Sequence, residues 1–405
     1  MSPELAAGLL LLAAYLVGAI PFGYLIGKAR GVDLFKAGSG NIGATNAARV
    51  LGRKYGLLVF VLDFLKGAIP VAAIVPLAAK YGADTALGSP DVLRVGAAAL
   101  AFLGHMFPVY LGFSGGKGVA TGAGTLFVLV PGPAALTITF WAVILLASRR
   151  VSVASIGCVV VLVAARLFGT PDAFSTANLP VTLYLLLGTA LVVVKHRSNV
   201  KRLVAGTEPV NISDGPRREF ALRAVHLVSL GVWFGGSLFF NFLTAPAIFA
   251  SFDEVARTAP SDRTAHEPLL PPDAGAARKQ RLGSALAGAA VGPVFPRYFA
   301  VQAICGGLAL VTALAWRSML RTLLIAFGLV YVAAGWPVSR HVTELRVARV
   351  DVTNPARAEA ARRAFTTWHF VSLGMSVMTV GVAGAALVLA AGLPDRPRDP
   401  TPPGG

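Results

Sequence analysis

Long apolar segments recur along the chain and alternate with short polar stretches. A segment of about twenty apolar residues with few charges is typical of a helix that crosses a membrane. The first half contains seven such segments: residues 5–27, 56–79, 92–112, 118–130, 132–147, 151–169 and 178–195. The fourth is short and is separated from the fifth only by a Pro-Gly-Pro turn. This pattern predicts an all-α, polytopic membrane domain with seven transmembrane helices over residues 1–208.

The second half has a different spacing. Residues 209–223 are polar and contain prolines and glycines, which is typical of a linker. A second membrane domain of about four transmembrane helices is predicted over residues 224–392, from the apolar segments 224–250, 299–315, 320–338 and 366–392. A polar loop, 251–297, is expected between the first two. The Pro-rich tail, 393–405, is expected to be disordered.

The basic residues of the first half gather in alternate loops. The formal net charge is +17, and the positive-inside rule places the basic loops in the cytoplasm: residues 28–54, 113–117, 149–150 and 195–202. The N-terminus is then external. This topology and attraction to anionic lipid account for the charge, so we expect a membrane-lipid partner and no nucleic acid. In the second half the Arg-rich stretch 339–364 would fall outside, so its topology stays open.

Two glycine-rich loops carry the most unusual chemistry. Residues 38–46 read "GSGNIGATN", which contains the spelling of a dinucleotide fingerprint. That fingerprint needs a strand before it and a helix after it within a βαβ unit, whereas a membrane helix precedes this loop. Residues 114–122 read "SGGKGVATG", with Lys117 between glycines. This loop lacks the full P-loop spacing, so an NTPase is not predicted.

The predicted topology places four polar motifs on the cytoplasmic face. They are the two glycine loops, Ser155 with its neighbours, and a stretch that includes His196 and Asn199. Glycine loops let backbone N–H groups approach an anion, and Lys117 would add a point charge. The alternative is that glycines permit tight turns while Lys and Arg are topology signals. Four such loops on one face favour an anion site.

Several polar residues fall inside or at the ends of apolar segments. Asp63 and Lys66 have helical i,i+3 spacing and are expected to form a structural ion pair. His105 is expected to support the second glycine loop, with a catalytic role as the alternative. His226 and His369 begin similar sequences and are a possible polar pair, although helix-end packing explains them equally well. The two cysteines lie in apolar segments, so we expect no disulfide, metal site or cofactor.

The quoted loops, together with "DFLKGAIPV", "GHMFPVYLGFSGGKGVATGAG", "SVASI" and "HRSNVKRL", resemble the bacterial acyl-phosphate:glycerol-3-phosphate acyltransferase (PlsY) family. The resemblance covers about residues 5–208 and is not found in the second half, whose function it leaves unknown. It implies a seven-helix protein of the bacterial inner membrane with an external N-terminus. The implied reaction transfers a fatty acyl group from acyl phosphate to position 1 of glycerol 3-phosphate and yields lysophosphatidic acid in phospholipid biosynthesis.

The resemblance also implies residue roles. Arg49, Lys117 and His196 would be the catalytic residues, with Arg49 and Lys117 holding phosphate groups. The substrate-binding residues would be Ser39, Gly40, Asn41, Gly116, Gly118, Ser155 and Asn199. By residue type His196 is the best general base, but a substrate phosphate oxygen that takes the proton, with His196 only binding, is the preferred expectation. The alternative function is a multi-span transporter of a phosphorylated or anionic solute.

Overall fold

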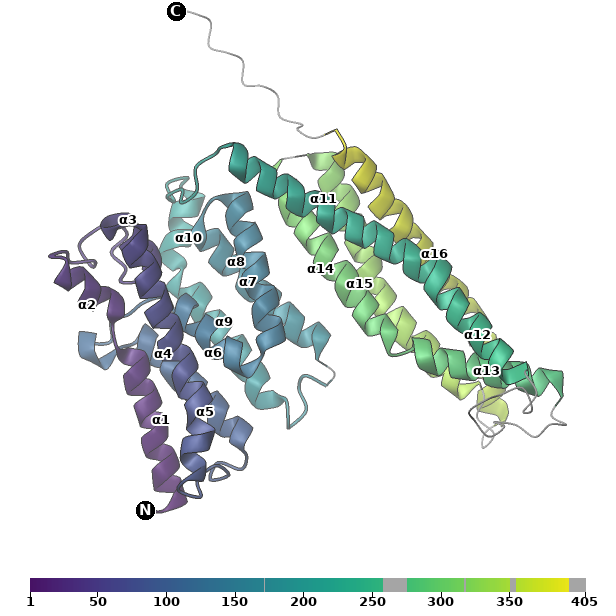
Figure 1. Cartoon of the computed structure of the whole chain (residues 1–405), viewed down its shortest axis with the longest axis horizontal. Coiled ribbons are helices and arrows are strands. Elements are labelled where there is room, and N and C mark those ends of the chain that lie inside the picture. Colours follow the sequence, from purple (N-terminus) through teal and green to yellow (C-terminus); the bar gives the residue numbers. More distant parts are fainter. Residues whose placement is uncertain (171, 258–274, 317, 350–354, 393–405) are drawn as a thin grey trace, which may run out of the picture. The chain divides into compact units, whose positions relative to one another are not determined.

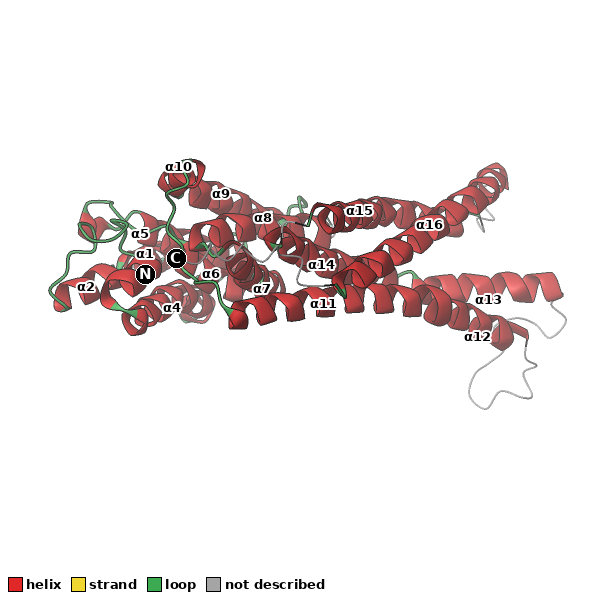
Figure 2. Cartoon of the chain, turned by 90° about the horizontal axis from the view of Figure 1, so that it is seen from above, coloured by secondary structure: helices red, strands yellow, loops and turns green. Residues whose placement is uncertain are grey.

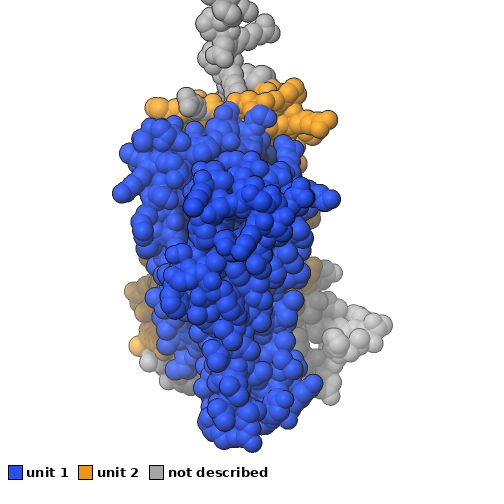
Figure 3. Space-filling model, turned by 90° about the vertical axis from the view of Figure 1, so that its left-hand side faces the viewer, with its two compact units in different colours: residues 1–213 blue, residues 214–405 orange. Residues whose placement is uncertain are grey.

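The computed structural model describes residues 1–170, 172–257, 275–316, 318–349 and 355–392. Its regular elements within these ranges are all helical, as the sequence predicts (Figures 1 and 2). Nine helices in the described part are long and apolar enough to cross a membrane, and up to ten if the bent pair α9 and α10 counts as one span. The chain is therefore a multi-pass membrane protein. It divides into two compact units, residues 1–213 and 214–405 (Figure 3).

The first unit contains ten α-helices and one short 3-10 turn, η1, over Val109–Leu111. The helices are α1 (Pro3–Ala19), α2 (Phe22–Ala29), α3 (Ala44–Leu51), α4 (Arg53–Ala79), α5 (Pro90–Met106), α6 (Val119–Leu129), α7 (Pro131–Ser148), α8 (Val151–Gly169), α9 (Leu179–Lys195) and α10 (Arg197–Val204). The breaks fall at residues that resist continuous helix. Pro21 separates α1 from α2, and Gly52 separates α3 from α4 at φ 100°.

Small side chains allow the helices of the first unit to pack closely. The cluster that joins α1, α4 and α5 is built largely from alanines, among them Ala6, Ala14, Ala78 and Ala97, each at most 3% exposed. Small residues are the usual means of close helix approach in membranes, where lipid removes the hydrophobic advantage of large side chains. This packing holds α1, α4 and α5 together.

The predicted fourth span corresponds to α6, which is much shorter than its neighbours. It has 11 residues, whereas about twenty are needed to cross the hydrocarbon core. By length it is therefore not among the nine candidate spans. The first unit thus has five long candidate spans, the bent pair α9–α10 and this short helix, so a seven-span arrangement stays a prediction.

Within its described residues the second unit has four helical segments, each longer than the apolar segment predicted for it. They are α11 (Pro216–Phe239) continued through η2 (Phe240–Thr244) into α12 (Ala245–Arg257), α13 (Ala276–Val291) followed by α14 (Val294–Ala315), α15 (Met319–Ala348) and α16 (Pro355–Ala390). The core includes Leu230, Trp233 and Phe299. Charged residues extend these helices beyond the apolar segments, which hydropathy alone does not detect.

These bounds correct three predicted segments. Residues 216–223 were assigned to the linker but are the first turns of α11, so the connection between units is shorter than expected. The loop predicted over 251–297 contains most of α12 and all of α13, while residues 258–274 lie outside the described residues. The tail over 393–405 also lies outside them. In the Arg-rich stretch 339–364, Arg346 belongs to α15 and packs on Phe249 and Phe365, so it is not simply a loop charge.

Candidate active site

The first unit contains a cavity of about 690 Å³, within the usual size range of small-molecule sites. One end is polar and is lined from four separate loop regions, including Arg49, Lys117, His196 and Asn199. The other end is apolar and includes Phe102, Leu126, Ile138, Trp141, Leu162 and Leu185. The four motifs predicted to meet on one face therefore do meet, around one cavity.

Eight of the ten predicted site residues line this cavity. They are Ser39, Asn41, Arg49, Lys117, Gly118, Ser155, His196 and Asn199. The other two, Gly40 and Gly116, are described by the structure but are not among the lining residues. Their predicted contact with substrate is not supported by this geometry, and each has a structural role instead.

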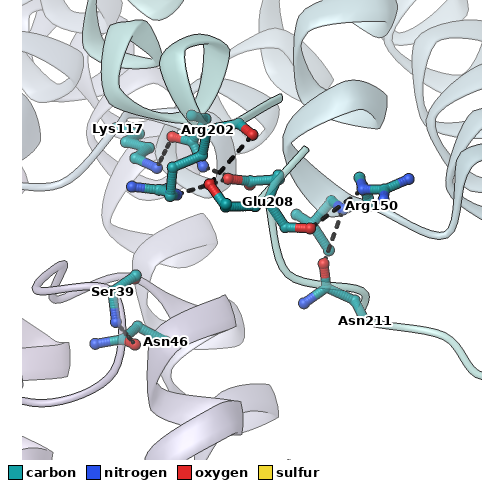
Figure 4. Close-up of polar contacts among 10 residues, drawn as sticks. Ser39, Asn46, Lys117, Arg150, Arg202, Glu208 and Asn211 are labelled. Atoms are coloured by element: carbon teal, nitrogen blue, oxygen red, sulfur yellow. Dashed lines mark hydrogen bonds and ion pairs between the residues drawn. The ribbon is translucent and has the colours of Figure 1, made fainter. Parts of the chain in front are cut away.

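The first glycine loop is folded onto Asn46, a buried residue of α3 (Figure 4). The Asn46 Oδ1 accepts from the Ser39 N–H at 2.8 Å, and its Nδ2 donates to the Ala37 carbonyl at 2.9 Å. The Gly40 N–H donates to the Ala37 carbonyl at 3.1 Å, and Gly40 has φ 69°, which a side chain would strain. The expected cradle of backbone N–H groups is therefore wrong for Ser39 and Gly40, because these amides already have partners inside the loop.

Side chains of the first loop remain directed to the cavity. Asn41 uses its Oδ1 to accept from the Gly43 N–H at 2.8 Å, which leaves its Nδ2 as the donor group. Helix α3 starts just after Gly43, and Ala44 and Thr45 at its N-terminus line the cavity. Arg49 lines the cavity from the same helix. The loop thus presents side-chain donors, a helix start and a cation in place of a row of glycine amides.

The second glycine loop is held against the end of α5. The Gly116 N–H donates to the His105 carbonyl at 3.1 Å, and a Cβ at Gly116 would overlap the His105 ring. His105 in turn lies 3.7 Å, Nδ1 to Oδ1, from Asp63, and Asp63 forms a 2.7 Å ion pair with Lys66. The predicted Asp63–Lys66 pair is therefore present, and His105 contacts the loop as expected. These contacts place Lys117, the next residue, at the cavity.

Lys117 is the cation at the centre of the polar end. Its Nζ donates to the Asn199 Oδ1. Burial lowers the pKa of Lys117 to about 8, and the nearby Arg202 and Arg49 cations act in the same direction. A lysine with this pKa is still mostly protonated at pH 7. It is also less hydrated than a surface lysine, so an anion can replace its water at low cost.

Glu208 is a site residue that the sequence analysis missed. Its Oε1 accepts from the Asn199 Nδ2 at 2.7 Å and its Oε2 accepts from the Arg202 Nε at 2.8 Å (Figure 4). Burial opposes ionisation, but these hydrogen bonds and the Arg202 charge lower the pKa of the Glu208 carboxyl. The carboxylate orients Asn199 so that its oxygen faces Lys117. The only sequence signal was an acidic residue beside a basic stretch, at the edge of what was taken for a linker.

His196 ends α9 and is 3% exposed. Its Nδ1 lies 2.8 Å from the Val192 carbonyl, which can only accept, so Nδ1 carries the proton and Nε2 has the free lone pair. Burial lowers the pKa of His196, with the Lys117 charge acting in the same direction, so the ring is neutral at pH 7. The histidine can therefore accept a hydrogen bond through Nε2.

Ser155 lies one turn into α8 and is 1% exposed. Its Oγ accepts from the Trp141 Nε1 at 3.3 Å. It lies on the same helix as Leu162, which lines the apolar part of the cavity. Ser155 thus stands between the polar and apolar ends, where the two parts of an amphiphilic ligand would join.

Comparisons with known proteins identify relatives of the first unit. A family model described as glycerol-3-phosphate acyltransferase matches residues 8–206. The chain is 44% identical over 202 residues to the glycerol-3-phosphate acyltransferase of Aquifex aeolicus, covering 96% of that protein and 49% of this chain. It is 42% identical over 211 residues to that of Anaeromyxobacter sp. strain K, covering 98% of that protein and 51% of this chain.

A crystal structure of PlsY, an integral membrane glycerol 3-phosphate acyltransferase, in its glycerol 3-phosphate form, is 39% identical, with a TM-score of 0.44. The match covers 50% of this chain and 94% of that one. The family resemblance seen in the sequence is confirmed by the relatives above, which match over nearly their whole length. Through its first unit, the chain belongs to the glycerol-3-phosphate acyltransferase family.

Proposed function

We propose that the first unit transfers a fatty acyl group from acyl phosphate to the 1-position of glycerol 3-phosphate. The products are lysophosphatidic acid and inorganic phosphate, which places the reaction in phospholipid biosynthesis. The observation that carries this proposal is the single cavity with a cationic end and an apolar end. Two phosphate-bearing substrates need the first end, and a fatty acyl chain needs the second.

The polar end offers cations from two sides. Lys117 and Arg202 lie on the side of Asn199 and Glu208, and Arg49 lies on the side of the first glycine loop. We assign one phosphate to Lys117 with Asn199, and the other to Arg49 with the side chains of Ser39 and Asn41. Gly118 lines the cavity and completes the Lys117 loop. Gly40 and Gly116 act through the shape of their loops.

The chemistry asks little of the protein beyond alignment and charge neutralisation. The glycerol 3-phosphate hydroxyl attacks the acyl carbonyl carbon, a C–O ester bond forms, and the bond from that carbon to the phosphate oxygen breaks. The hydroxyl proton goes to the departing phosphate, which leaves as hydrogen phosphate. His196 Nε2 accepts a hydrogen bond from the other hydroxyl of glycerol 3-phosphate, at position 2, and so orients the substrate. Alignment of this kind contributes about 7–11 kcal/mol to lowering a barrier, and the cations stabilise the departing anion.

Along α8 the cavity, including its polar end, extends over about the length of one fatty acyl chain. Ser152 and Leu162 of α8 both line the cavity, and at 1.5 Å per residue they lie about 15 Å apart along the helix. The hydrocarbon core of a bilayer is about 30 Å thick and holds two chains end to end. One acyl chain therefore fits alongside α8 between these residues.

We further propose the topology that the charge pattern predicts, in the bacterial inner membrane. The N-terminus is external and the active-site loops are cytoplasmic, with seven membrane-embedded helices in the first unit and four in the second. The convergence of the basic loops on one end of the cavity supports this orientation. The short α6 then enters the membrane from the cytoplasmic face without the length of a full span.

The transporter alternative is not retained. Transport sites lie near the bilayer midplane, at broken helices, whereas these polar groups lie at helix ends and in loops. Membership of the acyltransferase family also favours the enzyme.

The test is an assay of the purified full chain. Phosphate release from acyl phosphate should require glycerol 3-phosphate, and lysophosphatidic acid should form in equal amount. Release that is independent of glycerol 3-phosphate, or no release at all from folded protein, would contradict the proposal.

A further inference from the structure

The segment that follows α10 is part of the cavity wall. Residues 208–212 all line the cavity, although the family match ends at residue 206. The sequence pattern assigned most of this segment to a linker. A linker that only joins two units would have no reason to face the site. We call residues 208–212 the clasp.

The first part of the clasp is tied to α10 and to the turn between α7 and α8. The Glu208 N–H donates to the Arg202 carbonyl at 3.2 Å, and the Arg150 Nε donates to the Glu208 carbonyl at 3.2 Å (Figure 4). The carboxylate of Glu208 meanwhile holds Asn199 and Arg202. This residue therefore joins α10 to the α7–α8 turn.

The second part of the clasp acts on the start of α8 through Asn211. Its Oδ1 accepts from the Val151 N–H at 3.1 Å, and its own N–H donates to the Arg149 carbonyl at 2.8 Å. Val151 is the first residue of α8 and has no hydrogen-bond acceptor within its own helix. Arg150, the residue before it, provides no side-chain cap among the contacts of the described residues. Asn211 thus supplies from sixty residues away the cap that a local Ser or Asn would supply.

The Asn211 cap affects the site because Ser155, which lines the cavity, lies on α8. Ser155 lies near the start of the helix that Asn211 caps, so the position of that start sets the position of Ser155 opposite Lys117. We infer that the clasp is part of the acyltransferase site and that Asn211 is its positioning residue. The inference rests on the proposed function and on a substrate-binding role for Ser155, which the family resemblance implies.

The test compares Asn211→Ala with Asn211→Asp in the full chain. Alanine removes the acceptor for the Val151 N–H, whereas aspartate keeps it. Loss of such a hydrogen bond corresponds to about a tenfold change in an equilibrium constant. We therefore expect Asn211→Ala to raise the KM for glycerol 3-phosphate by about tenfold with a smaller change in kcat. Asn211→Asp should stay within about twofold of the unaltered chain.

Ser213→Ala is the matched control, since Ser213 follows the clasp and is not among the cavity residues. It should leave both constants unchanged. The inference is overturned if Asn211→Ala keeps the KM of the unaltered chain, or if aspartate is as defective as alanine. If the unaltered chain itself shows no transfer that depends on glycerol 3-phosphate, the proposed function has failed instead.

Discussion

The two units are both apolar helical bundles, but they use their polar groups differently. In the first unit the polar groups of the site lie in loops and at helix ends, and they converge on a cavity. In the second unit, polar side chains of α11 and of the following η2 segment pair with side chains of α14. The His226 Nδ1 lies 2.8 Å from the Thr312 Oγ1, the Trp233 Nε1 donates to the Gln302 Oε1 at 3.4 Å, and the Asn241 Nδ2 donates to the Tyr298 OH at 2.6 Å.

This difference gives a way to distinguish polar groups that bind a ligand from polar groups that hold helices together in a membrane protein. A polar group inside a helix must find a partner within the protein, because lipid offers none. Such pairs hold helices together. Polar groups at helix ends can instead be left with donors or lone pairs directed into a cavity, as the His196 Nε2 is. The three polar pairs of the second unit are of the kind that holds helices together, so helix packing explains them.

The two histidines of the second unit illustrate the point. The repeat around His226 and His369 indicated a possible polar pair. Among the described residues, however, His226 bonds Thr312 and packs on Trp316, whereas His369 stacks on Phe365 with ring centroids 5.5 Å apart. The two residues have different neighbours on different helices. Neither residue begins a helix, since α11 starts at Pro216 and α16 at Pro355, so the helix-end interpretation is wrong and the repeat is not a shared site.

Removal of the central cation should have the largest effect on the first unit. Lys117→Ala is expected to lower kcat/KM by about 10²–10³, the usual cost of losing one preorganised electrostatic group. Lys117→Arg should also be poor, because a planar fork does not replace a point charge in a tight loop. Steady-state kinetics of purified variants measure this, with size-exclusion chromatography as the folding control. Near-normal kcat/KM in folded Lys117→Ala would contradict the assignment.

The charge state of Lys117 predicts that kcat/KM for glycerol 3-phosphate depends on pH. Its pKa is lowered to about 8, so the free enzyme carries the cation below that pH and loses it above. We expect kcat/KM for glycerol 3-phosphate to fall as pH rises through about 8, by tenfold per unit at higher pH. Bound phosphate stabilises the cation, so kcat should fall at a higher pH. A flat kcat/KM profile between pH 7 and 9.5 would show that Lys117 does not need its charge.

Steady-state kinetics can distinguish two roles of His196, orienting the substrate and accepting the proton. If it only orients the substrate, His196→Asn should raise the KM for glycerol 3-phosphate by about tenfold, with a smaller loss of kcat. The measurement is the KM for glycerol 3-phosphate and the kcat of both proteins at saturating acyl phosphate. A large loss of kcat with an unchanged KM would instead identify His196 as the proton acceptor.

The smallest effect is expected from removal of the second unit. A chain that ends after Ser213 keeps the cavity residues and the clasp, so its kcat in detergent should stay within about twofold of the full chain. A chain that ends after Thr207 lacks the clasp and should be strongly impaired. Complementation of a bacterium without its own acyltransferase compares both fragments. If the longer fragment is expressed in the membrane but inactive, the two units form one catalytic assembly.

Local pattern was enough to predict the helices and the basic loops, and the family resemblance supplied eight of the residues that line the cavity. Hydropathy and charge are properties of neighbouring residues, so the helical class and the meeting of four motifs follow from the order of residues along the chain, while the sidedness of the loops stays a prediction. The same pattern could not locate helix ends in the second unit. There charged residues extend α11 to α16 past their apolar segments. Arg346, for example, packs on the Phe365 ring inside the folded unit.

The partners of individual hydrogen bonds were decided only by the tertiary structure. The amides of Ser39 and Gly40 turn toward Asn46 and Ala37, and Asn211 caps a helix that begins sixty residues earlier. The periodicity of apolar residues carries no information about contacts between distant segments. Many acceptors are possible partners for each donor until the chain is folded. The sequence by itself therefore determined the family, the helical class and the cations of the site. The folded structure decided which backbone groups stay free for substrate. It also decided that the segment taken for a linker belongs to the site.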